Sequence, residues 1–280
     1  MIKLYNLLGE VTNASGVNAG AIGGQENPKA IILAGAPGAG KGYVLKGLNI
    51  SNLQVLNVDD DYIKKLKDAN VSLDLKNATA DERSKQAVAM ASANKEFKGR
   101  VQKTIEAKQS FILDGTAGSF KQTSSLREEL IKAGYEVFML YVYTDLERSL
   151  MQNQDRFERS SGKDRSLAPA IVLRTWNSVT NNYQPYREMF GSDNFVSVAN
   201  TLEDEKLDNL DDITDKYLKP YAAKNTKPKT AARQAYSDKQ KEKTTKEINA
   251  LLSDDGVRDI IDNSVSKEEA QVSIGKFLNK

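Results

Sequence analysis

Residues 31–48, IILAGAPGAGKGYVLKGL, contain the glycines and the lysine of a phosphate-binding loop. Gly35, Gly40 and Lys41 match the pattern G-x-x-x-x-G-K, between an apolar stretch and a helix-compatible stretch. In that context backbone amides turn toward a phosphate, the following helix presents its positive end, and the lysine adds a charge at the β- and γ-phosphates. The sequence therefore predicts a nucleotide site. Its expected residues are Gly35, Ala36, Pro37, Gly38, Ala39, Gly40, Lys41, Gly42 and Tyr43.

Two positions of this loop depart from the usual pattern. Gly42 stands where many loops carry a magnesium-binding Ser or Thr, and Tyr43 follows it. The tyrosine hydroxyl can donate a hydrogen bond, but its side chain is larger and stiffer than that of threonine. We expect Tyr43 to decide how well the loop works, with Lys41 and the backbone amides supplying most of the grip on phosphate.

Carboxylates are the expected acid–base groups, because the chain contains no histidine and no cysteine. That absence excludes Ser-His-Asp catalysis, thiolate nucleophiles and zinc–thiolate sites, and it leaves hard cations bound by oxygen, which favours Mg²⁺. Asp59, Asp60 and Asp61 directly follow the apolar stretch 53–58. One of them is a candidate general base, whereas a purely structural reading places acids at a helix N-terminus, the better interpretation for Asp61.

Two further segments carry candidate chemistry. In FILDGTAG, Asp114 ends an apolar stretch and is placed to orient a magnesium ion or its waters. The alternative is a turn capped by Asp114 and Thr116. The stretch of about 151–170 is rich in arginine, as expected of a lid over a transferring phosphoryl group.

These segments, in this order, resemble zeta-toxin-type P-loop kinases over about residues 29–200, closest to versions in large tailed, T4-like phages. The resemblance implies that Asn57 and Asp59 occupy the places of an Asn-x-Asp step whose aspartate activates the acceptor; aligning on the spacing to the aromatic residue selects Asp60 instead. It further implies that Arg156 and Arg165 are the lid arginines. Asn57, Asp60 and Thr116 are the expected substrate contacts.

The resemblance implies an ATP- and Mg²⁺-dependent phosphotransferase that moves the γ-phosphate to a hydroxyl of a small molecule such as a nucleotide sugar. An antitoxin-like protein partner also fits. The loop GAPGAGKG is equally similar to that of adenylate kinases, which share the glycine at position 42, so a nucleotide kinase is one alternative. Acids after the second strand disfavour it, because its acceptor is anionic. A non-catalytic nucleotide-binding phage protein is the other alternative.

Five apolar stretches must position these residues: 29–34, 53–58, 110–114, 135–143 and 194–199. They alternate with helix-compatible stretches, which indicates a parallel five-stranded sheet with helices on both faces, the three-layer α/β fold of P-loop kinases. Ligands of such sheets bind beyond the carboxyl ends of the strands. The candidate residues all follow strands, so we expect them to meet at that edge.

The 280 residues suffice for one such domain with an appendage. We expect a flexible leader (1–28), a kinase domain (29–218), a basic linker (219–243) and a helical appendix (244–280) opened by a capping box from Ser266 to Glu269. The net charge of +2 does not indicate a nucleic-acid-binding protein, and contact with nucleic acid through 219–243 is the less favoured reading. Without an apolar run of about 18 residues, we expect no membrane span and a cytoplasmic location, the host cytoplasm if a phage encodes the chain.

Overall fold

The computed structural model describes residues 26–48, 53–161, 164–201, 210–220, 231–253 and 255–279. Within these residues five strands form one fully parallel sheet in the order β2-β3-β1-β4-β5. The strands are β1 (Lys29–Ala34), β2 (Gln54–Asn57), β3 (Phe111–Asp114), β4 (Glu136–Tyr143) and β5 (Phe195–Ala199). They confirm the predicted sheet, and each expected stretch contains one strand.

The central strands are apolar throughout because both of their faces are buried. In β1, Ala30 and Ile32 face one core cluster while Ile31 and Leu33 face the other. Strands buried on both sides need this near-continuous apolar pattern. The register sets Leu33 and Asn57 each opposite Asp114, so the carboxyl ends of β1, β2 and β3 meet at one edge.

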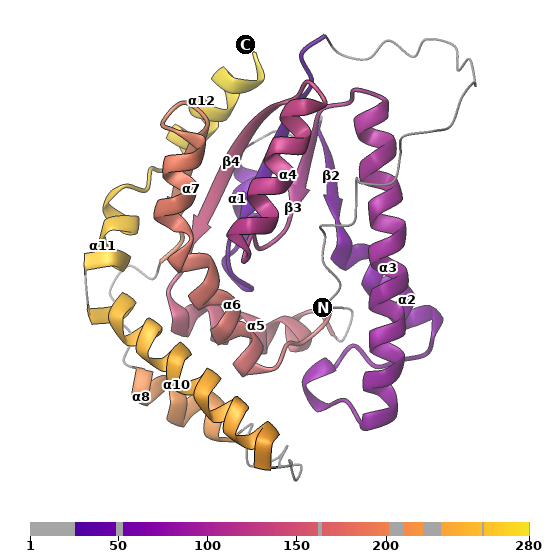
Figure 1. Ribbon diagram of the computed structural model, residues 1–280, viewed down its shortest axis with the longest axis vertical. Helices are drawn as coiled ribbons and strands as arrows, with labels where there is room; N and C mark the ends of the chain where they lie inside the picture. The colour runs from indigo at the N-terminus through magenta and orange to yellow at the C-terminus, as the bar shows by residue number, and fades with distance from the viewer. Residues whose placement is uncertain are drawn as a thin grey trace.

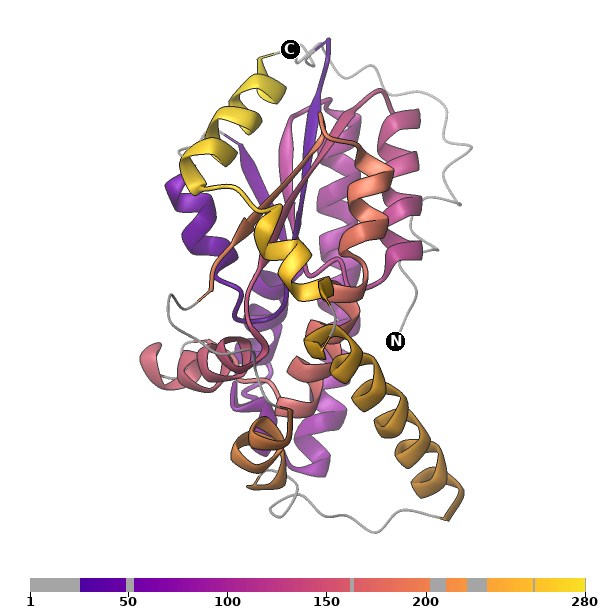
Figure 2. The ribbon, with the colours of Figure 1, turned by 90° about the vertical axis from the view of Figure 1, so that its left-hand side faces the viewer.

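Helices cover both faces of the sheet. Figure 2 shows α1 (Lys41–Gly47) and α12 (Lys267–Leu278) on one side, with α4 (Phe120–Lys132) and α7 (Tyr183–Phe190) on the other. Helix α6 (Pro169–Asn181) contributes Val172, Trp176 and Val179 to the second face, where the Trp176 Nε1 donates to the Thr144 carbonyl at 2.8 Å. The lone tryptophan is a core residue, as the helical spacing around it predicts.

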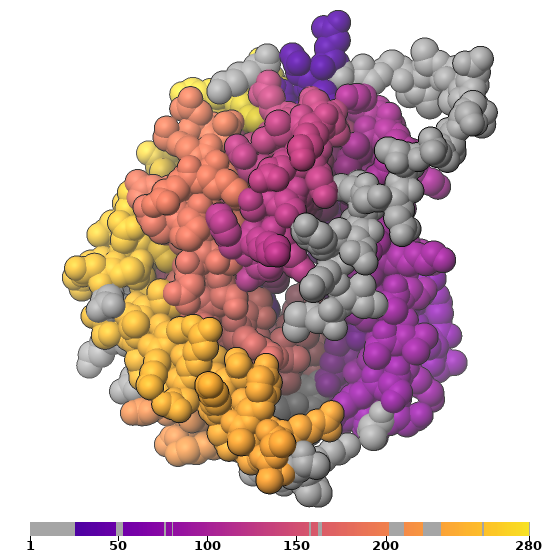
Figure 3. Space-filling model, in the orientation of Figure 1, coloured from indigo at the N-terminus to yellow at the C-terminus, as the bar shows by residue number. Residues whose placement is uncertain are grey.

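Two groups of helices flank the three layers, one beside β2 at the right of Figures 1 and 3 and one at the lower left that includes α10 (Ala231–Ser253). Beside β2, α2 (Val58–Asp68) and α3 (Ala80–Glu106) pack around a small core of their own that includes Tyr62 and Leu66. The connection between them contains a short turn of helix, η2 (Leu75–Asn77). The remaining helical elements are α5 (Leu146–Arg159), α8 (Leu210–Ile213), η3 (Thr214–Leu218), α10 (Ala231–Ser253) and α11 (Asp255–Asp262).

The C-terminal part differs from the expected linker and appendix. Helix α10 runs unbroken across the expected boundary at residues 243 and 244, and Ile248 on it is buried in the main core. The polar composition of its first half conceals a helix, which is stabilised by i,i+4 contacts such as Gln234 with Asp238 and, at its centre, Glu242 with Lys246. Ser266 and Glu269 form the predicted capping box. The expected leader lies outside the described residues up to 25, as does the linker from 221 to 230.

Helix α12 belongs to the core of the three-layer domain itself. Ala270, Ile274 and Phe277 are fully buried against the sheet face that carries Ile31 and Phe138. Without this helix the face beside α1 is only partly covered. The segment from 244 onward therefore completes the three-layer fold instead of standing apart from it.

Candidate active site

The phosphate-binding loop connects β1 to α1 and depends on its glycines. Gly38 and Gly40 have φ values of 78° and 80°, in the left-handed region that disfavours other residues. A Cβ atom on Gly40 would lie 2.3 Å from the side-chain amide of Asn200. The loop thus requires glycine for both backbone conformation and space.

Lys41 begins α1 and is enclosed by the loop. Its Nζ donates to the carbonyls of Gly35 at 3.0 Å and Ala36 at 3.3 Å. Burial lowers the pKa of Lys41, while the nearby carboxylates of Asp114 and Asp59 raise it. The lysine therefore lies between the loop and the two carboxylates predicted to do chemistry.

Most of the predicted residues surround one cavity of about 750 Å³ beyond the carboxyl ends of the strands, whereas Gly35, Ala36 and Pro37 belong to the loop but do not line the cavity. The members of the predicted set that line it are Gly38, Ala39, Gly40, Lys41, Gly42, Asn57, Asp59, Asp114, Thr116, Arg156 and Arg165. They come from the loop, the end of β2, α2, the end of β3 and the turn after it, α5, and the segment after α5. This is where a parallel sheet of this kind binds its ligands.

Asn57 links two of the strand ends. Its Nδ2 donates to Asp114 Oδ2 at 2.8 Å, and its Oδ1 accepts from the backbone N–H of Asp59 at 2.8 Å. The second bond caps the N-terminus of α2. Burial raises the pKa of Asp114, although the charge of Lys41 and the bond from Asn57 counteract this. A carboxylate held in this way stays oriented toward the loop.

The three consecutive acids point in three directions, since successive helical residues are about 100° apart. Asp59 lines the cavity and pairs with Arg165 at 2.5 Å. Asp61 pairs instead with Arg100 on α3 at 2.6 Å, which ties the two helices together. Asp60 is exposed and is not part of the cavity wall, which differs from its expected role as a substrate contact. The geometry favours Asp59 among the acids.

The predicted lid comprises the end of α5 and the segment from Asp164 onward. The guanidinium of Arg165 is largely buried and lies 5.9 Å from the centre of the Tyr62 ring on α2. Arg156 projects from α5 into the same cavity and pairs with Asp164. Arg159 is a further cavity residue, so three arginines converge there.

Sequence reasoning did not identify the residues that hold the loop from outside. The Ser149 hydroxyl on α5 donates to the Pro37 carbonyl at 2.5 Å, and the Asn200 amide donates to the Ala39 carbonyl at 2.9 Å. Ser149 and Asn200 carry no local motif. Their positions are the sequence signal that could have identified them, because Ser149 lies one turn into the helix after β4 and Asn200 directly follows β5.

Tyr43 lies outside the cavity, which differs from the expected phosphate contact. Its side chain is 61% exposed, and its hydroxyl accepts a hydrogen bond from Lys267 Nζ at 2.7 Å. The same ammonium lies 4.1 Å from the centre of the tyrosine ring. The reason is helical geometry, because a residue two positions after Lys41 is rotated by about 200° around α1. Tyr43 therefore connects α1 to α12 and leaves the loop unobstructed.

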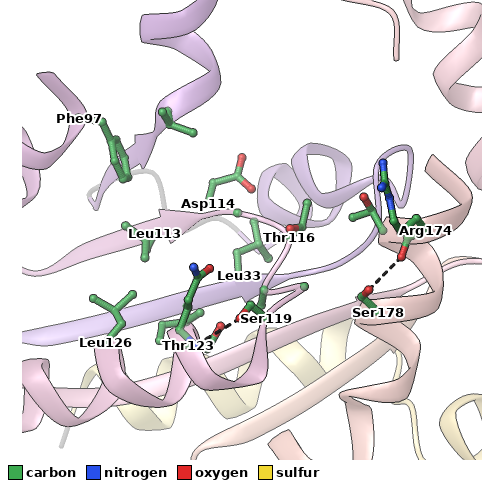
Figure 4. Close-up of a pocket in the computed structure, with 17 residues that line it drawn as sticks. Leu33, Phe97, Leu113, Asp114, Thr116, Ser119, Thr123, Leu126, Arg174 and Ser178 are labelled. Atoms are coloured by element: carbon green, nitrogen blue, oxygen red, sulfur yellow. Dashed lines mark hydrogen bonds between the residues drawn. The ribbon is translucent and has the colours of Figure 1, made fainter. Parts of the chain in front are cut away.

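A second cavity of about 420 Å³ adjoins the first and is shown in Figure 4. The two share Val58, Asp114, Gly115 and Thr116. The second has apolar walls that include Phe97, Leu113 and Leu126. Its polar groups come from α4 and α6 and include Ser119, Gln122, Thr123, Arg174 and Ser178.

The donor atoms fit Mg²⁺ held mainly by a nucleotide. Within the described residues, no group of three or more His, Cys, Asp or Glu side chains could hold a metal. Mg²⁺ commonly binds through one or two carboxylates together with substrate phosphates and water, and it prefers oxygen. Asp114 and the Thr116 hydroxyl, both on the cavity wall beside Lys41, match that donor set.

Comparison with known proteins identifies a family. The family model described as zeta toxin matches residues 19–204. Among solved structures, the PezAT toxin–antitoxin system of Streptococcus pneumoniae is 15% identical with a TM-score of 0.49, covering 82% of this chain and 89% of that one. An AvrRxo1-ORF1:-ORF2 complex with ATP is 15% identical with a TM-score of 0.48, covering 64% and 56%. These matches do not support the predicted closeness to proteins of large tailed phages.

No curated protein sequence matches the chain. Among the described helices, none is long and apolar enough to cross a membrane.

Proposed function

This chain belongs to the zeta toxin family, and from that premise we propose that it transfers the γ-phosphate of ATP to a hydroxyl group of a small molecule. The observation that carries the proposal is the convergence of Lys41, Asp59 and Asp114 with two lid arginines on one cavity. A phosphate grip, a base, a metal-orienting carboxylate and cationic groups for the transition state are the parts that phosphoryl transfer needs.

The phosphate-binding loop and Lys41 hold the ATP phosphates. The loop amides and the N-terminus of α1 attract the anion, and Lys41 adds a charge at the β- and γ-phosphates. Bound Mg²⁺ would supply charge neutralisation across those phosphates. Asp114, oriented by Asn57, would hold the ion or its waters.

Asp59 is the proposed general base. Its carboxylate is part of the cavity wall, and the pairing with Arg165 keeps it oriented. In the reaction it accepts the proton of the acceptor hydroxyl as the oxygen attacks the γ-phosphorus and the bond to the ADP oxygen breaks. Arg156 and Arg165 stabilise the charge on the transferring group.

The acceptor occupies the second cavity in this proposal. Donor and acceptor then meet at Asp114 and Thr116, the residues that border both cavities. Apolar walls with several hydroxyl groups and Arg174 at the edge suit a small molecule that is both polar and anionic, such as a nucleotide sugar. An antitoxin-like protein partner is part of the same proposal and rests on family membership alone.

The test is ATP turnover with Mg²⁺ against a panel of nucleotide sugars, nucleotides and RNA ends. Wild type is compared with Asp59→Asn and Lys41→Ala. We expect one small-molecule class to be phosphorylated, Asp59→Asn to bind ATP without turnover, and Lys41→Ala to lose ATP affinity. A wild-type protein that binds ATP and phosphorylates no member of the panel would count against the enzyme. Phosphorylation of nucleoside monophosphates alone would favour the adenylate-kinase-like alternative.

A further inference from the structure

We propose that Asp164 is the positioning residue of the lid, holding Arg156 in the orientation in which it contacts the γ-phosphate and tying it to the segment that carries Arg165. The inference rests on the proposed function, and it concerns a residue that lies next to Arg165 and belongs to no motif.

Both carboxylate oxygens of Asp164 are engaged with the lid arginines. Oδ2 accepts from the Arg156 Nε, and Oδ1 accepts from the backbone N–H of Arg165 at 2.8 Å. The backbone N–H of Asp164 itself donates to the Ser160 hydroxyl at 3.0 Å. One side chain thus connects the end of α5 to the segment that carries the second arginine.

The contact with Arg156 leaves its phosphate-binding groups available. A guanidinium is planar, so fixing its Nε edge sets the direction of the two terminal amino groups. Within the described residues, the Arg156 guanidinium forms no other hydrogen bond, and it lies on the cavity wall. Asp164 therefore orients the fork without occupying the atoms that bind phosphate bidentately.

The Arg165 side of the lid is anchored to α2 and the turn after it. The Arg165 side chain pairs with Asp59, and the fully buried Ser166 donates its hydroxyl to Asp74 at 2.8 Å and its backbone N–H to the Leu73 carbonyl at 3.1 Å. These contacts fix the segment on one side, while Asp164 ties it to α5 on the other. Loss of Asp164 would free Arg156 while leaving Arg165 attached.

The test measures affinity for ATP and for ADP with Mg²⁺ on the full chain, by calorimetry. Only ATP carries the γ-phosphate, so the affinity ratio reports on the groups that contact this phosphate, and every variant tested leaves Lys41 and the loop intact. We expect Asp164→Ala to lower the ATP-to-ADP ratio about tenfold, the order of a charge-assisted hydrogen bond, with ADP affinity unchanged. Asp164→Asn keeps an acceptor oxygen without the charge and should fall between.

A double-mutant cycle separates positioning from a general structural role. If Asp164 acts through Arg156, the variant with both Asp164→Ala and Arg156→Ala should lose no more of the ratio than Arg156→Ala alone. Glu147→Ala on the same helix is the matched control: its partner is Lys216 on η3 at 2.5 Å, neither residue lines the cavity, and the variant should keep the wild-type ratio. Circular dichroism verifies the fold of each variant.

Two results would overturn the inference. One is a wild-type ATP-to-ADP affinity ratio in folded Asp164→Ala, and the other is a double variant in which the losses of this ratio from the two single variants add. A wild type that binds ATP but phosphorylates no acceptor would defeat the proposed activity and still leave the ratio to decide on Asp164. A wild type that binds neither nucleotide would refute the proposed function together with this inference.

Discussion

Replacing Phe277 by alanine should destabilise the whole kinase domain, even though the residue lies far beyond the family match. Phe277 is 1% exposed, and its ring centre lies 5.0 Å from that of Phe138 on the inner strand β4. The ammonium of the buried Lys29 lies 5.3 Å from the same ring and also pairs with Glu136 at 2.7 Å. The side chain therefore fills the core and covers a buried charge.

Truncating a buried phenylalanine to alanine costs about 3–5 kcal/mol, through lost transfer free energy and the cavity that remains. The neighbours here are strands of the central sheet, which cannot collapse into the space, so we expect about 4 kcal/mol. For a domain of this size, roughly 2–4 °C of melting temperature corresponds to each kcal/mol, so Tm should fall by about 8–16 °C.

The assay is urea unfolding followed by two signals. Circular dichroism reports on all helices, and the fluorescence of Trp176, the chain's single tryptophan, reports on the opposite face of the sheet. Both midpoints should shift together. Val272→Ala on the same helix is the control, because Val272 is 56% exposed and its truncation should change stability by about 0.5 kcal/mol or less. The reasoning fails if Phe277→Ala leaves the tryptophan midpoint unchanged while helical signal is lost, because the C-terminal helices would then unfold independently.

Four further outcomes are expected. Asp59→Asn should lower turnover by about 10²–10⁴-fold with ATP affinity retained, whereas Asp60→Asn should keep the wild-type rate. If both variants lost turnover equally in a steady-state assay, Asp59 would not be the base. Gly40→Ala should reduce ATP affinity at least about tenfold. Alanine is strained by about 1–2 kcal/mol in the left-handed region, and its Cβ would lie 2.3 Å from the side-chain amide of Asn200. Wild-type ATP affinity in calorimetry would contradict this prediction. Asp114→Asn should raise the melting temperature of the nucleotide-free protein at neutral pH while removing Mg²⁺-dependent turnover. The pKa of the Asp114 carboxyl is raised in the folded state, so this carboxyl ionises first in the unfolded chain, and the wild type loses stability as pH rises above the ordinary pKa of aspartate. The difference in melting temperature between variant and wild type should vanish in acid, where the carboxyl is protonated in both states. A difference that does not depend on pH would exclude this cause. Tyr43→Ala should leave ATP affinity unchanged and alter stability by less than about 1 kcal/mol, because the exposed ring pairs with Lys267 of α12 and lies outside the cavity. A large loss of ATP affinity would show that Tyr43 belongs to the site.

Much of the fold and part of the site follow from local sequence. The five strands are predictable because strands buried on both faces must be apolar along their length, and β1 to β5 each lie within an expected stretch. The phosphate-binding loop is recognisable because its glycines and Lys41 act within a few consecutive residues. The meeting of Asp59, Asp114 and the lid arginines is also foreseeable, since parallel strands end at one edge.

The tertiary structure decided the rest, for a reason that Tyr43 and Asn57 illustrate. Whether Tyr43 faces a phosphate depends on its angle around α1 and on Lys267, a residue 224 positions away. Asn57 reaches Asp114 because β2 pairs with β3, a strand order that apolar patterning does not specify. Periodicity and motifs report contacts between near neighbours in the chain, whereas these contacts join residues that only the packed sheet brings together. The same holds for Asp164, whose role depends on where the lid packs, and for α12, whose apolar residues are buried because they cover the sheet face beside α1.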